Sequence, residues 1–107
     1  MSMIDIKNIL WKVLNNEASL VEDDIKLYHL KEGILTEEDL KKWKEVVRLL
    51  REAYYASYKN QKEAIQKVTK SLEIINTITP KKPMPPEMKI RFEDLRKNLE
   101  IISKLNS

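Results

Sequence analysis

Between Gly33 and Pro80 the chain contains neither glycine nor proline, the two residues that most often end helices. Thr36, with Asp39 three residues later, forms a helix-capping signal at the start of this stretch. We therefore predict one long helix over about 37–77. Its apolar residues recur at spacings of three and four and so share one side, which contains Leu40, Trp43, Val47, Leu50, Tyr54, Ala64, Val68 and Ile75.

The centre of this predicted helix is polar. Extending its apolar side by heptads places Ser57, Gln61 and Ser71 where apolar residues are expected. Either the helix breaks near 58–60, or it runs unbroken for about 60 Å with a polar layer. The absence of glycine and proline favours the unbroken helix. With Tyr54 and Tyr58, Ser57 and Gln61 form a possible small pocket, although a hydrogen-bonded layer or a joint between two packing partners is the interpretation we prefer.

Two shorter helices are predicted before the long one. The first covers about 3–15 and ends at Asn15-Asn16, and the second covers about 20–31 after the capping signal Ser19-Leu20-Val21-Glu22. Gly33 is well placed as a left-handed cap after the second helix. Trp11 lies off the apolar stripe of the first helix, so it either packs on a neighbouring helix or marks an interface.

All four prolines fall in the segment 79–86, which predicts a stiff extended connector because proline cannot continue a helix. Pro86 is suited to the first position of a last helix over about 87–105, which has apolar residues along one face. One glycine and seven aromatic residues in 107 argue against a β-rich fold. The sequence predicts an all-α protein, a single domain over 1–107 in which about four helices form a small bundle around the long central helix.

The residue types needed for catalysis are scarce. There is no cysteine, His29 is the only histidine, and Gly33 is the only glycine. A thiolate nucleophile, a zinc site or a glycine-rich phosphate loop therefore has too few residues. Clustered acids near helix starts are explained by the helix dipole. We expect no enzyme activity, no metal and no cofactor.

The location of the protein is inferred from the same composition. The N-terminal segment is interrupted by charges and does not resemble a signal peptide, and no apolar run approaches 18 residues. With no cysteine for disulfides, these features predict a cytoplasmic protein without a membrane span. The high content of charged residues, 35%, is typical of thermophile proteins.

Charge is unevenly distributed along the chain. Residues 1–40 contain four lysines and nine acids, whereas residues 41–70 contain nine basic residues and three acids. On a continuous helix, nine positions opposite the apolar side fall within an arc of about 100° and include no acid. This basic stripe is about 43 Å long. Its members other than Gln66, with two lysines of the connector, are the predicted nucleic-acid-binding residues: Lys41, Lys44, Arg48, Arg51, Tyr55, Lys59, Lys62, Lys70, Lys81 and Lys82.

Lysine and arginine bind phosphates without reading sequence, so the main functional expectation is a largely sequence-independent accessory domain for DNA or RNA. Four alternatives remain. The face is simply solvated, or it binds an acidic protein. Otherwise the protein is an interaction or homodimerisation module that pairs through the long helix. A further possibility is a helical domain of a replication protein that holds a nucleotide or template beside the tyrosines.

Overall fold

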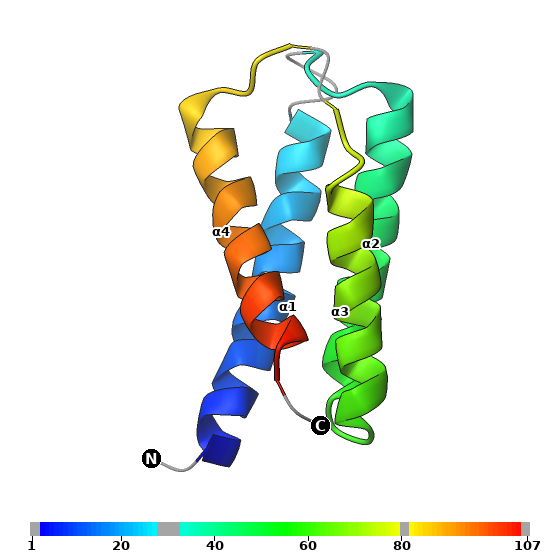
Figure 1. The fold of residues 1–107 in the computed structure, drawn as a ribbon. Coiled ribbons are helices and arrows are strands. Elements are labelled where there is room, and N and C mark those ends of the chain that lie inside the picture. The colour runs from blue at the N-terminus through cyan, green and yellow to red at the C-terminus, as the bar shows by residue number, and fades with distance from the viewer. Residues whose placement is uncertain (1–2, 28–32, 80–81, 106–107) are drawn as a thin grey trace.

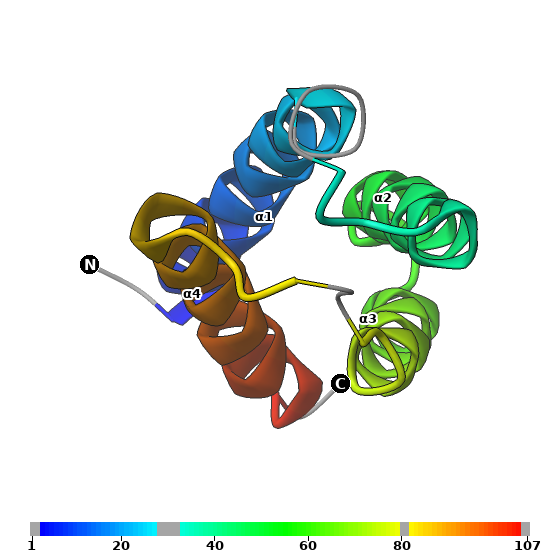
Figure 2. The ribbon, with the colours of Figure 1, turned by 90° about the horizontal axis from the view of Figure 1, so that it is seen from above.

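The computed structural model describes residues 3–27, 33–79 and 82–105, with side chains from residue 11 onward. Within these residues there is no strand, and helices that follow one another in the chain run in opposite directions (Figure 1). Viewed along the bundle, the helices occupy its four corners in chain order (Figure 2). The predicted all-α bundle of about four helices is therefore confirmed. The helices are α1 (Met3–Leu27), α2 (Glu37–Ala56), α3 (Gln61–Ile75) and α4 (Pro86–Ser103).

The prediction of one helix over 37–77 is wrong. The chain turns back after Ala56, and α3 runs antiparallel to α2 (Figure 1). Asn60 explains the restart: its backbone is extended, at φ −147°, and its side-chain oxygen accepts a 3.2 Å hydrogen bond from the Glu63 amide. Ser57 closes the preceding helix by donating to the Tyr54 carbonyl at 2.6 Å. Side-chain hydrogen bonds therefore reverse the chain without glycine or proline.

The prediction of two helices over 3–15 and 20–31 is also wrong, because α1 runs without a break to Leu27. Ser19 does not cap a new helix; its hydroxyl donates back to the Asn15 carbonyl at 3.4 Å, inside the helix. One apolar seam spans the predicted break, so packing overrides the local signals. Its buried residues are Trp11, Leu14, Ala18, Val21 and Ile25. Trp11 belongs to this buried seam, so the prediction that it lies off the apolar stripe is wrong, whereas its burial agrees with packing on a neighbouring helix. Residues 28–31 lie outside the described residues.

The connections that lead into α2 and α4 follow the sequence signals. Thr36 caps α2 with a complete capping box, in which its hydroxyl accepts from the Asp39 amide at 3.0 Å and the Asp39 carboxylate accepts from the Thr36 amide at 3.3 Å. Gly33 has a φ of 63°, as predicted for a left-handed position. Pro86 is the first residue of α4, one residue before the predicted start.

The core lies between the four helices. Each helix contributes residues at spacings of three and four, including the fully buried Leu14, Leu50, Val68 and Leu99. Ser71 is fully buried among them, and its hydroxyl donates to a carbonyl of its own helix, that of Lys67, at 3.0 Å. The polar residue at this apolar position therefore needs no partner from another helix.

Candidate binding groove

The basic stripe predicted from the sequence does not form one line. Its first part lies on α2, Lys59 lies in the turn, and Lys62 and Lys70 lie on α3, which runs back alongside α2. Lys82 lies at the opposite end of the bundle from Lys59, where its Nζ approaches Gly33. Lys81 lies outside the described residues. The reversal at 57–60 therefore divides the predicted 43 Å surface, and its length was wrong because the helix is not continuous.

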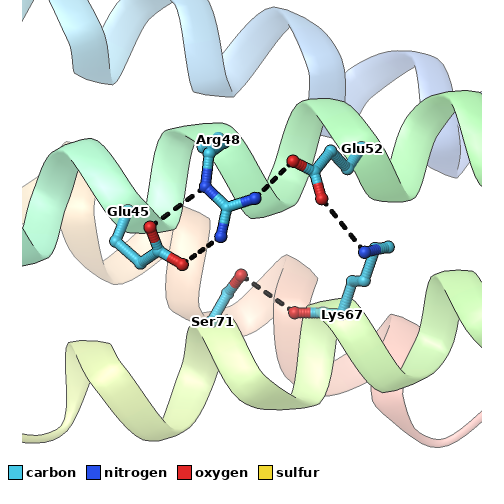
Figure 3. Close-up of polar contacts among 5 residues, drawn as sticks. All are labelled: Glu45, Arg48, Glu52, Lys67 and Ser71. Carbon is cyan, nitrogen blue, oxygen red and sulfur yellow. Dashed lines mark hydrogen bonds and ion pairs between the residues drawn. The ribbon is translucent and has the colours of Figure 1, made fainter.

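Carboxylates of the protein occupy part of this surface. Arg48 forms ion pairs with both Glu45 and Glu52 on α2 (Figure 3). Glu52 also accepts from Lys67 of α3, with Nζ 3.0 Å from Oε1. The hydrogen bond from Arg48 lowers the pKa of Glu45, and hydrogen bonds from Lys67 and then Arg48 lower the pKa of Glu52. Part of the outer surface of α2 and α3 is therefore a network of paired opposite charges.

A groove of about 490 Å³ lies between α1 and α2. Its floor is apolar, formed by Ile25, Leu40 and Val47. Charged side chains surround this floor, and the exposed ring of Tyr55 also lines the groove. Four cations and two carboxylates give the lining a positive charge; these are Lys26, Lys44, Arg48, Arg51, Glu22 and Glu52.

The cations of the groove differ in how they are paired. Arg51 bridges α2 to α1, with Nη2 3.3 Å from Oε1 of Glu22 and 3.5 Å from Oγ of Ser19. Lys26 and Lys44 are exposed and make no hydrogen bond or ion pair with the residues that the structure describes. An anionic group entering the groove therefore meets two lysines whose charge is not already neutralised by a neighbouring carboxylate.

Sequence reasoning found only one side of this groove. Lys44, Arg48, Arg51 and Tyr55 were predicted as binding residues because they share a face of α2. The contribution of α1 was missed, including Lys26. The position of Lys26 within the helical repeat of α1 shows only that its side chain is exposed. Which helix lies beside Lys26 depends on tertiary packing. Lys41 is exposed on α2 but does not line the groove.

Tyrosines gather near the turn that joins α2 to α3. The hydroxyls of Tyr54 and Tyr58 are 2.9 Å apart, and the ring of Tyr54 lies 5.5 Å from those of Tyr55 and Tyr58. The pKa of Tyr54 is raised, mainly by the hydrogen bond with Tyr58 and to a smaller extent by burial. The positive charge of Lys12 acts in the opposite direction. Tyr55 and Tyr58 are each about two-thirds exposed, at 69% and 67%.

A small cavity of about 140 Å³ lies beside these tyrosines. Ser57 and Tyr58 line it together with Trp11 and Lys12 of α1. The predicted pocket residues Tyr54 and Gln61 are not part of its lining. Tyr54 instead forms the hydrogen-bonded pair with Tyr58. The polar residues predicted at the centre of one long helix thus lie near the turn of a helical hairpin.

Comparison with known proteins identifies no relative: no family model, no curated protein and no solved structure matches the chain. None of the helices in the described residues is long and apolar enough to span a bilayer. The groove and the tyrosines are therefore interpreted from their own geometry and charge.

Proposed function

We propose that the protein is a non-enzymatic, cytoplasmic interaction domain that binds an acidic, amphipathic segment of a partner protein in the groove between α1 and α2. The observation that carries this proposal is the combination of an apolar floor with a cationic rim. An amphipathic helix commonly binds by placing its apolar side chains in such a groove. Its carboxylates would then meet Lys26 and Lys44.

The size of the groove suits a helical segment. On α2 its lining runs from Leu40 to Tyr55, which corresponds to about 22 Å of helix, or roughly four turns. A partner helix of that length presents three or four apolar side chains on one face. Nucleic acid gains little from an apolar floor, because its affinity comes chiefly from phosphate contacts. The floor therefore favours a protein partner over a phosphate backbone.

The test uses a fluorescein-labelled peptide with leucines on one helical face and glutamates on the other, and a scrambled peptide of the same composition. Fluorescence anisotropy measures binding to the wild-type protein. The double variant Lys26→Glu/Lys44→Glu should weaken binding at least about tenfold, equivalent to about 1.4 kcal/mol. The matched control Lys62→Glu/Lys70→Glu makes the same change in net charge, but on α3 and away from the groove. Equal losses in the two variants, or equal binding of the scrambled peptide, would reject the groove.

A second candidate function is the binding of single-stranded nucleic acid at the α2–α3 turn. The exposed rings of Tyr55 and Tyr58 support it, because exposed tyrosines can stack on unpaired bases and Lys59 in the turn can contact phosphates. A fluorescein-labelled oligothymidylate tests this in a salt series. Binding should weaken steeply with salt and be lost in Tyr55→Ala/Tyr58→Ala. Binding that is unchanged in this variant would eliminate the stacking site.

A further inference from the structure

The exposed aliphatic side chains are concentrated on one face of the bundle. Among the described residues, seven large hydrophobic side chains are exposed, and two of these are the tyrosines near the α2–α3 turn. The other five all lie on α1 and α4, and none lies on α2 or α3. Scattered exposed aliphatics are ordinary, but a cluster confined to two adjacent helices indicates an interaction surface. The five are Val13, Leu20, Leu27, Ile90 and Ile101.

On α1 these residues form an evenly spaced row. Val13, Leu20 and Leu27 are separated by seven residues, so they lie almost directly above one another on one face. Leu20 is the midpoint of this row. If a second α1 is laid antiparallel on the first with Leu20 facing Leu20, Val13 of each copy meets Leu27 of the other.

The outward face of α4 has the same kind of symmetry. Its midpoint lies between residues 95 and 96, and an antiparallel second copy places Ile90 opposite Ile101 of the partner. The same pairing places Asp94 opposite Lys97 and Glu87 opposite Lys104. All four of these charged side chains are exposed. Apolar residues thus meet apolar residues, and acids meet lysines.

The two midpoints lie at the same height in the bundle. Arg91 of α4 pairs with Asp24 of α1 at 3.1 Å, and Asn98 donates to Glu17 at 2.6 Å. These contacts fix the register of the antiparallel helices, and the midpoint of α4 falls beside residues 19 and 20 of α1. A single two-fold axis at this level therefore relates both the α1 row and the α4 pairs to their counterparts in the second copy.

We propose that two copies of this chain associate through the α1/α4 face as an antiparallel, two-fold symmetric dimer centred on Leu20. Such an interface is self-complementary, because the same patch is used by both copies. The face is about 21 Å long and two helices wide, so each copy contributes roughly 400 Å². The total of roughly 800 Å² is below the roughly 1,200–2,000 Å² that stable complexes bury, so we expect weak, concentration-dependent association. The α1/α2 groove lies on another side of α1 and remains open.

Sedimentation equilibrium from about 10 μM to about 1 mM brackets the affinities of interfaces of this size. The wild type should convert from monomer to dimer in this range. Leu20→Asp places two carboxylates together at the axis and should leave a monomer, with an unchanged circular dichroism spectrum because Leu20 is half-exposed. A monomer throughout the range for the wild type, or the same dimerisation constant for Leu20→Asp, would overturn the proposal.

A charge exchange tests the antiparallel register. Asp94→Lys alone places lysine opposite lysine and should weaken the dimer. The double variant Asp94→Lys/Lys97→Asp restores opposite charges across the axis and should recover most of the affinity. Failure of the double variant to recover dimerisation would contradict this register.

Cross-linking gives a second test, because the chain has no cysteine of its own. A disulfide requires Cβ atoms about 3.5–4.5 Å apart, so only residues close to the axis can pair with themselves. Leu20→Cys should form a covalent dimer under mild oxidation. The matched control Thr69→Cys, exposed on α3, should remain monomeric. Equal cross-linking of the two variants would show random collision and refute the two-fold axis at Leu20.

Discussion

Replacing Asn60 by alanine tests the reversal of the chain between α2 and α3. A helical hairpin and an uninterrupted helix predict changes in stability of opposite sign. In the helical hairpin, Asn60 caps α3 through its 3.2 Å bond to the Glu63 amide. Loss of an N-cap costs about 1 kcal/mol, within a range of roughly 0.5–2 kcal/mol. In an uninterrupted helix, position 60 would be an interior site, where alanine is better than asparagine by roughly 0.5 kcal/mol.

The expected shift in melting temperature follows from the size of the chain. An unfolding entropy of about 2.1 cal/mol/K per residue gives about 225 cal/mol/K for the 107 residues. Losing about 1 kcal/mol should therefore lower Tm by about 4 °C. In an uninterrupted helix, Asn60→Ala would instead raise Tm by about 2 °C. Differential scanning calorimetry resolves this difference.

Two further variants serve as controls. Asn60→Asp retains a side-chain acceptor for the Glu63 amide and should keep Tm within about 2 °C of the wild type. Lys59→Ala removes an exposed side chain from the same turn without touching the cap and should change stability by no more than about 0.5 kcal/mol. A higher Tm for Asn60→Ala would refute the capped hairpin.

Three other perturbations probe the core and one half-buried carboxylate. Leu50→Ala empties a fully buried position and should lower the free energy of unfolding by about 2–5 kcal/mol in urea titrations. Ser71→Ala should change it by less than about 1 kcal/mol in the same assay, because the hydroxyl bonds only to a carbonyl of its own helix. Burial raises the pKa of Glu17 above its ordinary 4.5, against the opposing hydrogen bond from Asn98. A raised carboxyl pKa favours the folded state at low pH, and this contribution is lost as the pH rises through the folded pKa. Glu17→Gln should therefore raise Tm at pH 7, with a gain that shrinks as the pH falls through the folded pKa and is lost below about pH 4.5; a gain independent of pH would contradict this origin.

The sequence was sufficient to predict the fold class and several element boundaries. Thr36 with Asp39 correctly marked the start of α2, and Pro86 lies at the first position of α4. Both are strong local signals that packing does not oppose. The break after Ala56 also had a local signal, since Asn60 and Glu63 have the spacing of an N-cap and its partner. The absence of glycine and proline favoured the unbroken helix, but the Asn60 cap is the stronger signal in the structure.

Other features could not be predicted because they depend on tertiary contacts. Ser19 and Asn15 carry signals for a helix boundary, yet α1 continues because its apolar seam is buried on both sides of them. The α2 side of the groove was predictable from a shared helical face. Its α1 side, including Lys26, was not, because spacing within α1 does not reveal which neighbour it packs against.

The order of the helices around the bundle bears on how fast the protein folds. The contacts of α1 with α2, α2 with α3 and α3 with α4 join segments adjacent in the chain. Segments far apart are joined mainly by α1 with α4, together with the ring contact of Trp43 on α2 with Phe92 on α4. Chains dominated by such local contacts fold in microseconds to milliseconds. Docking of α4 on α1 closes the longest loop and carries the largest loop-closure entropy. This late step also completes the surface on which a second copy would assemble, so association should follow folding rather than assist it.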